Sequence, residues 1–288
     1  MQVTRIRPQG FCKGVVRAIR IAEDTALQYP NTPIYILGMI VHNRFVVDSL
    51  DKLGIKTLND KNKSRLELLD EIDTGVVILT AHGTSDEVKS KAESKGLIVI
   101  DATCLDVEKT KQLIVDKLKN NFDIAYIGKQ NHPEAEAMVS ICQQKIHLIS
   151  SYEDAINFNI QNDNIFITNQ TTMSLLEVND WISNIIERYP NAEIQQEICA
   201  ATRMRQEAIM KLGNDFDAIF VVGDPNSNNT QKLADIAKNI DFKKVFTIES
   251  VADIQNINLS GINNVAITSG ASTPTYLTDD IVTFLETQ

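Results

Sequence analysis

The chain has 288 residues and a formal net charge of −10 at pH 7, which argues against a broad surface for nucleic acid or for an anionic membrane. Its hydrophobic share of 43% is ordinary for a globular protein, and no run approaches the roughly 20 apolar residues that a membrane-spanning helix requires. The first residues lack the apolar core of a signal peptide, so we expect a cytoplasmic protein. Disulfides are uncommon in that compartment, and the four cysteines are therefore expected to be ligands or catalysts.

Apolar runs rich in valine and isoleucine alternate with helical patterns along the whole chain. This alternation is typical of parallel strands joined by helices. In chain order, the expected strands are 3–7, 34–38, 55–58, 76–81, 97–101, 124–128, 146–150, 165–169, 193–197, 218–223, 245–248 and 265–269. Four strands in each third predict an α/β fold of three pseudo-repeated modules with mainly parallel four-stranded sheets. The modules are expected at 1–96, 97–192 and 193–288, with the N-terminal strand able to pack with the third.

Polar residues follow the strands in a similar rhythm in each third. Cys12, Cys104 and Cys199 lie at nearly equal intervals, and each is followed by a second polar residue and then by a third. These six residues are His42, His132 and Asn229, then His82, Thr171 and Ser272. Ligands of open parallel sheets bind beyond the carboxyl ends of the strands. Three such sheets facing one another would bring all nine residues into one central cavity.

Each of these three cysteines lies where a helix is expected to begin, a position that favours the thiolate. No close pair of cysteines is present, which disfavours a structural zinc site. A four-iron cluster with three protein thiolates would leave one iron open to substrate. On spacing alone, the alternative that all three are small buried side chains stays open. The fourth cysteine, Cys142, is expected in the core of a helix at 135–143.

Three of the four histidines, at 42, 82 and 132, follow strands, and imidazole groups donate hydrogen bonds to phosphate oxygens. His147 lies within a strand and is expected to be structural. The segments 226–230 and 269–274 place hydroxyls, amides and backbone N–H groups at helix starts, as a phosphate cradle does. Each segment taken alone also fits ordinary caps and turns. No nucleotide-binding loop motif is present.

A candidate proton donor, Glu134, follows His132 and Pro133 at the start of a predicted helix. By default its carboxylate would interact with the positive end of that helix. If the side chain points into a cavity, it becomes a plausible general acid. Thr171 lies in a hydroxyl-rich segment, 168–172, that could relay a proton or bind a substrate hydroxyl.

Nine segments, in order along nearly the whole chain, resemble the LytB family. They are Gly10–Val15, Val41–Arg44, Ala81–Gly83, Asp101–Cys104, His132–Glu134, Gln170–Thr172, Ile198–Thr202 with Arg205 and Gln206, Asn226 and Ser227 with Asn229, and Ser269–Ser272. Any one segment is weak, but nine in order are highly specific.

The resemblance implies a trefoil of three α/β modules around one [4Fe–4S] cluster per chain, bound by Cys12, Cys104 and Cys199. It implies reductive dehydroxylation of 4-hydroxy-3-methylbut-2-enyl diphosphate to isopentenyl and dimethylallyl diphosphate, the last step of the non-mevalonate isoprenoid pathway. Ferredoxin or flavodoxin would donate the electrons. Glu134, His132 and Thr171 would be catalytic. The substrate would be bound by His42, His82, His132, Thr171, Ser227, Asn228, Asn229 and Ser272.

Several positions depart from the usual pattern of the family. Leu105 replaces a proline, Lys129 and Asn131 replace a histidine and a glycine, Asn228 replaces a serine, and Thr275 replaces an acidic residue. None of these changes removes a proposed cluster ligand or Glu134. We therefore expect altered affinity at most.

Two other functions are compatible with the same residues. One is a metalloenzyme with a mononuclear metal, or a cysteine hydrolase, that uses the histidines and cysteines. The other is a non-catalytic anion-binding protein built from three repeats, in which the cysteines would be dispensable for ligand binding.

Overall fold

The computed structural model describes the chain apart from residues 61, 214, 241 and 243. The chain forms two compact units. Unit 1 comprises Met1–Lys13, His42–Phe45 and Cys199–Gln288, and unit 2 comprises Gly14–Val41 and Val46–Ile198. Among the described residues, no helix combines the length and the apolar character needed to cross a membrane.

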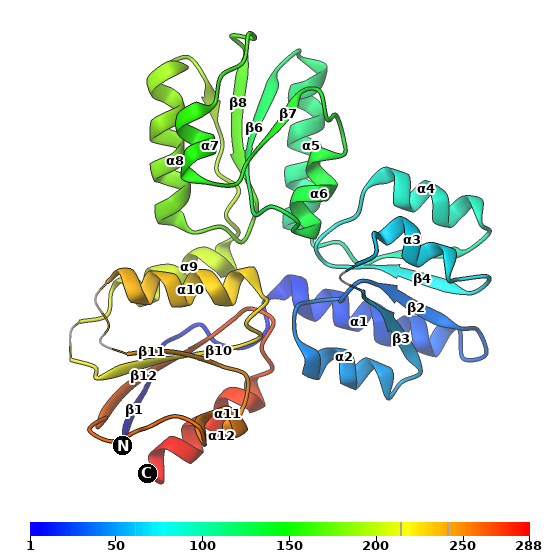
Figure 1. The fold of residues 1–288 in the computed structure, drawn as a ribbon. Coiled ribbons are helices and arrows are strands. Elements are labelled where there is room, and N and C mark those ends of the chain that lie inside the picture. The colour runs from blue at the N-terminus through cyan, green and yellow to red at the C-terminus, as the bar shows by residue number, and fades with distance from the viewer. Residues whose placement is uncertain (61, 214, 241, 243) are drawn as a thin grey trace. The chain divides into compact units, whose positions relative to one another are not determined.

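Unit 1 is built on a parallel sheet with the strand order β1-β12-β10-β11. Its strands are β1 (Gln2–Arg5), β10 (Ala218–Val222), β11 (Val245–Ile248) and β12 (Asn264–Ser269). Two helices cover each face (Figure 1): α9 (Ala200–Met210) and α10 (Asn228–Asn239) on one, α11 (Val251–Ile254) and α12 (Thr275–Glu286) on the other.

Unit 2 contains two parallel sheets, and the first has the order β3-β2-β4-β5. Its strands are β2 (Ile34–Leu37), β3 (Ile55–Leu58), β4 (Val76–Leu79) and β5 (Ile98–Asp101). Helices cover both faces (Figure 1): α3 (Arg65–Asp70) and α4 (Asp86–Ser94) on one, α1 (Lys13–Gln28) and α2 (Arg44–Asp51) on the other.

The second sheet of unit 2 has the order β7-β6-β8-β9. Its strands are β6 (Asp123–Ile127), β7 (Ile146–Ile149), β8 (Ile165–Asn169) and β9 (Glu193–Ile194). The covering helices are α5 (Leu105–Lys119) and α6 (Pro133–Val139) on one face, α7 (Tyr152–Asn157) and α8 (Leu175–Arg188) on the other.

The central strands are buried on both faces because helices pack against each side of every sheet. All residues of β4, β8 and β10 are buried, as are four of the five in β6. Double-sided burial explains why these strands are continuous runs of apolar residues rather than alternating patterns. The predicted α/β fold with three parallel four-stranded sheets is confirmed.

The sheets differ from the expected modules in which strands they include. The strand β5 was expected to open the second module, but it pairs with β4 in the first sheet of unit 2. Likewise β9 pairs with β8 rather than with the strands of the last third. The N-terminal β1 pairs with β12 in the last third of the chain, as the sequence allowed. Consecutive elements tend to be neighbours in space, and one crossover helix after β4 is enough to return the chain beside it.

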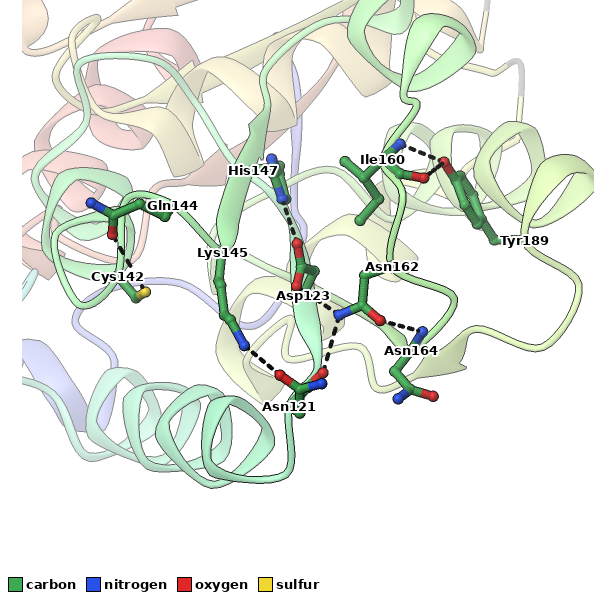
Figure 2. A network of polar contacts seen from close by, with 10 residues as sticks. All are labelled: Asn121, Asp123, Cys142, Gln144, Lys145, His147, Ile160, Asn162, Asn164 and Tyr189. Carbon is green, nitrogen blue, oxygen red and sulfur yellow. Dashed lines mark hydrogen bonds and ion pairs between the residues drawn. The ribbon is translucent and has the colours of Figure 1, made fainter.

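Two elements are shorter than the sequence indicates. The strand expected at 193–197 ends at Ile194, and the chain then runs irregularly to the start of α9. The helix expected at 135–143 ends at Val139, so Cys142 lies beyond it and is only partly buried. The prediction that Cys142 lies within a helix is therefore wrong, although its partly buried side chain does pack against the core cluster that contains Met138 and Ile146. Its sulfur instead lies 3.8 Å from the Gln144 side-chain oxygen (Figure 2).

A polar network surrounds the start of β6, as Figure 2 shows. The Asp123 carboxylate pairs with His147 Nε2 at 3.1 Å and accepts a hydrogen bond from the Asn162 amide at 2.8 Å. Beside it, Lys145 Nζ donates to Asn121 Oδ1 at 2.6 Å. These contacts tie β6 to β7 and to the loop before β8, which fits the structural role expected for His147.

Candidate functional site

The loop that carries Cys12 is held against the end of β12 in unit 1. The backbone N–H of Gly10 donates to Ser269 Oγ at 3.0 Å, and that of Cys12 donates to the Ala271 carbonyl at 3.0 Å. Gly10 has φ = 76°, and a Cβ there would lie 2.5 Å from Thr275 Oγ1. A glycine is therefore required for the close approach that positions Cys12.

Cys199 begins α9, also in unit 1, and occupies its N-cap position. Its sulfur contacts Thr202 Oγ1 at 3.2 Å. Arg205, in the next turn, is buried, and this burial lowers its pKa, whereas the charges of Cys12 and Cys199 raise it. The two cysteines of unit 1 thus share one buried cation.

A cluster of buried polar side chains lies at the start of α10. Ser227 is the N-cap, and its hydroxyl accepts a hydrogen bond from the Thr230 backbone N–H at 3.4 Å. Asn228 and Asn229 follow and are only 2% and 4% exposed. Both polar atoms of the Asn229 amide are buried and make no hydrogen bond with any described residue. A buried amide without a partner is costly, and a bound anion would offer it an acceptor.

His42 and Ser272 are neighbours within unit 1. The Ser272 hydroxyl donates to the His42 backbone carbonyl at 3.0 Å, and Ser272 itself is buried. This contact joins the short segment around His42 to the loop after β12, so both residues are held near the end of the same sheet.

In unit 2, Cys104 occupies the N-cap position of α5. Its backbone N–H donates to the Ala81 carbonyl at 3.0 Å, which brings the cysteine beside the loop that carries His82. The rings of His82 and His132 meet edge to face, with 5.3 Å between centroids and 80° between planes. Two of the predicted polar residues, which follow different strands, therefore lie together within this unit.

His132 caps α6 with its ring. The Nδ1 atom accepts a hydrogen bond from the Glu134 backbone N–H at 3.1 Å. In a neutral imidazole only one ring nitrogen carries hydrogen, so this bond assigns the hydrogen to Nε2. His132 is thus oriented as a hydrogen-bond donor through Nε2.

Glu134 is the most deeply buried acidic side chain of the site, at 1% exposure. The Thr171 backbone N–H donates to its Oε1 at 2.7 Å, and the Thr171 hydroxyl donates to its Oε2 at 2.9 Å. Burial raises the pKa of Glu134 to about 7, although the hydrogen bonds from Thr171 act in the opposite direction. A carboxyl with this pKa carries a proton on about half of the molecules at neutral pH, as a general acid requires.

Three residues near these groups were missed by sequence reasoning. Arg205 entered only as part of a motif, and Tyr126 only as part of an apolar strand. Arg65 lies in a polar stretch, yet it is a positioning residue for the His82 loop. Its guanidinium donates to the Gly83 carbonyl at 2.6 Å and to Thr84 Oγ1 at 2.8 Å, and burial lowers its pKa to about 10. No sequence signal distinguished it from the exposed cations around it.

Two departures from the family pattern have a local explanation. Asn131 has φ = 58°, and asparagine is one of the few residues other than glycine that adopts this conformation readily. The backbone N–H of Lys129 donates to Gln170 Oε1 at 2.8 Å, a bond that does not depend on the Lys129 side chain. Both substitutions therefore preserve the loop before His132.

None of the four cysteines is in a disulfide. The predicted residues that lie in unit 1 are Cys12, His42, Cys199, Ser227, Asn228, Asn229 and Ser272, and those in unit 2 are His82, Cys104, His132, Glu134 and Thr171. In each unit they lie at the carboxyl ends of parallel strands or at the helix starts that follow. Cysteine sulfurs at helix starts, two of them beside a buried cation, are chemically suited to hold a metal cluster.

A family model and named relatives match nearly the whole chain. The family model described as "LytB protein" matches residues 3–286. The chain is 48% identical to the 4-hydroxy-3-methylbut-2-enyl diphosphate reductase of Geobacillus sp. (strain WCH70) over 99% of this chain and 90% of that protein. It is 45% identical to the reductase of the same name from Bacillus subtilis (strain 168), over 99% of this chain and 91% of the other.

Solved structures show the same likeness. The reductase structure from Plasmodium falciparum has a TM-score of 0.91 and 32% identity, and the match covers 99% of this chain and 87% of that one. A second structure, described as (E)-4-hydroxy-3-methyl-but-2-enyl diphosphate reductase, the terminal enzyme of the non-mevalonate pathway, has a TM-score of 0.67 and 28% identity with full coverage of both chains.

Proposed function

The chain belongs to the LytB family, and on that premise we propose that it removes the hydroxyl group of 4-hydroxy-3-methylbut-2-enyl diphosphate reductively. The substrate takes up two electrons and two protons, its C–O bond breaks, and the oxygen leaves as water. Protonation at one or the other end of the allylic carbons gives isopentenyl or dimethylallyl diphosphate. The reaction is the terminal step of the non-mevalonate pathway.

We propose that Cys12, Cys104 and Cys199 hold one [4Fe–4S] cluster per chain. The support is the donor chemistry: three cysteines outside disulfides at helix starts, and a buried guanidinium beside two of them. When bound, such a cluster supplies a Lewis-acidic iron and transfers single electrons. Because the chain has no nucleotide-binding loop motif, ferredoxin or flavodoxin is the proposed electron donor. The proposed location is the cytoplasm.

The proposed role of Glu134 is to hold and deliver a proton. Its carboxyl is excluded from water, fixed by two hydrogen bonds from Thr171, and has a pKa of about 7. The proton is therefore available at neutral pH and is delivered from one position. Thr171 orients the carboxyl and offers its hydroxyl oxygen to a substrate hydroxyl. The complete burial of this carboxyl, with both oxygens held by Thr171, is the observation that carries the catalytic assignment.

The remaining polar residues are proposed to bind the diphosphate. In unit 1 they are Ser227, Asn228, Asn229, Ser272 and His42, and in unit 2 they are His82 and His132. The Asn229 amide supports this role because it is buried without a partner among the described residues. His132 supports it because Nδ1 accepts the Glu134 backbone N–H, which assigns the ring hydrogen to Nε2. Neutral donors at helix starts can bind an anion although the whole chain is acidic.

A turnover assay tests the proposed function. The chain is purified without oxygen, supplied with the allylic diphosphate and a dithionite-reduced viologen dye, and the products are separated by chromatography. We expect oxidation of the dye together with formation of both five-carbon diphosphates. A chain that binds the substrate but neither oxidises the dye nor forms these products would contradict the proposal.

A further inference from the structure

Arg205 has surroundings that are unusual for a buried cation. Its side chain lies in the second turn of α9 and is only 3% exposed. A buried charge without an opposite charge costs several kcal/mol, so buried arginines usually pair with carboxylates. Within the described part of the chain, the hydrogen-bond partners of Arg205 are three backbone carbonyls, and no carboxylate is among them.

Two of the three carbonyls belong to the segments that carry the cysteines of unit 1. The guanidinium donates to the carbonyl of Gly10 at 2.6 Å, two residues before Cys12. It donates to the carbonyl of Ala201 at 2.9 Å, two residues after Cys199. A longer bond of 3.3 Å reaches Ser269 at the end of β12. One planar side chain therefore joins both cysteine segments to the sheet.

The negative groups that act on the Arg205 charge are the cysteine sulfurs. Burial lowers its pKa, and the groups that raise it are Cys12 and Cys199. Arg203 lies on the same helix but is exposed, and it makes none of these contacts. The two arginines therefore separate the effect of a buried charge beside the sulfurs from that of a charge on the surface of α9.

We propose that Arg205 is a positioning residue for the metal site, which fixes the Cys12 and Cys199 segments and stabilises the reduced form of the group that they hold. The proposal rests on the proposed function. Reduction adds negative charge between the two sulfurs, and a fixed cation nearby favours that state. The guanidinium fork acts separately, because it holds the backbone on both sides of the ligands as outer-shell groups do in other metal sites.

The test uses the anaerobically reconstituted protein and three variants. Arg205→Gln removes the charge and the fork, Arg205→Lys retains the charge without the fork, and Arg203→Gln removes a surface charge from the same helix. The measurements are the midpoint reduction potential, followed by electron paramagnetic resonance, and the rate at which a chelator removes iron. Circular dichroism of the metal-free proteins shows whether each variant is folded.

We expect Arg205→Gln to have a more negative midpoint potential and to lose iron about tenfold faster or more. Arg205→Lys should keep a potential close to that of the unchanged protein but should lose iron faster, and Arg203→Gln should match the unchanged protein in both. If Arg205→Gln takes up no cluster while the folded Arg205→Lys variant does, the requirement for the charge is supported.

Equal potentials and equal iron loss in Arg205→Gln and Arg203→Gln would overturn the proposal while leaving the proposed function intact. If the unchanged protein itself took up no iron, the proposed function would fail, and the role of Arg205 with it.

Discussion

The two units differ in whether a buried polar side chain has hydrogen-bond partners. In unit 1 the Asn229 amide is buried and makes no hydrogen bond with any described residue. In unit 2 the Glu134 carboxyl is equally buried but receives two hydrogen bonds from Thr171. The first arrangement leaves donors and acceptors for a ligand, whereas the second retains a proton inside the protein. Burial alone therefore does not indicate a role, and the decisive property is whether the buried group already has partners.

The largest effect is expected from Glu134→Gln, which removes the proposed proton donor that Thr171 holds by hydrogen bonds. Turnover should fall by about 10²–10⁴-fold, the range of general acid catalysis, with little change in KM. The matched control is Glu136→Gln, since Glu136 lies on the same helix but is exposed. Equal turnover in the two variants would show that Glu134 is not the acid.

The pH dependence of stability follows from the same carboxyl. The folded-state pKa of about 7 lies above the ordinary 4.5, so the folded protein binds more protons between these values. Stability from this group is complete below pH 4.5 and is lost as the pH rises to 7, by up to about 3 kcal/mol. Urea unfolding of the metal-free proteins measures the effect. Glutamine does not titrate, so the Glu134→Gln variant should become progressively more stable relative to the unchanged chain as the pH rises from 4.5 to 7. A difference in unfolding free energy that stays constant over this range would contradict the raised pKa.

The buried Asn229 amide, which has no hydrogen-bond partner among the described residues, is tested by Asn229→Ala. Loss of a hydrogen bond to a charged diphosphate should raise KM about 10–100-fold, whereas folding stability should not fall, because no described residue loses a partner. Asn239→Ala, at the exposed C-terminal end of the same helix, is the control. A large loss of stability in Asn229→Ala with unchanged KM would reverse the assignment.

The opposite outcome is expected for Thr171→Val. This change leaves Glu134 Oε2 without its hydroxyl donor, so stability should fall by about 1–3 kcal/mol. The pKa of Glu134 should also rise, because the lost hydrogen bond lowers it in the unchanged chain. Thr171→Ser retains the hydroxyl and should restore both properties, as followed by urea unfolding at two pH values. A serine variant that behaves like the valine variant would point to packing instead.

Much of the fold was predictable because strands that are buried on both faces have a recognisable sequence pattern. Strands such as β4 and β10 are continuous apolar runs bounded by polar residues, and their positions were close to those expected. Sheet membership was harder. The pairing of β5 with β4 depends on where the crossover helix returns the chain, and the residues of β5 do not specify it.

The site was predictable where residues lie at strand ends, and not where partners are remote backbone groups. Glu134 and Thr171 follow two strands of one sheet, so their proximity follows from the topology. Arg65 and Arg205 bind backbone carbonyl oxygens of loops that are distant in the sequence. Because every residue has a backbone carbonyl, the sequence does not indicate which one an arginine will bind. The sequence also could not predict that the Asn229 amide lacks a partner among the described residues, because it does not show which buried groups form hydrogen bonds.

The central claim is that three remote cysteines hold one cluster. The most direct test is the iron and sulfide content of the anaerobically purified chain and of its four single Cys→Ser variants. We expect about four iron atoms and four sulfides per chain in the unchanged protein and in Cys142→Ser, and loss of both in the variants at Cys12, Cys104 and Cys199. A chain without sulfide, or one that keeps its full cluster when Cys12, Cys104 or Cys199 is replaced, would contradict the account.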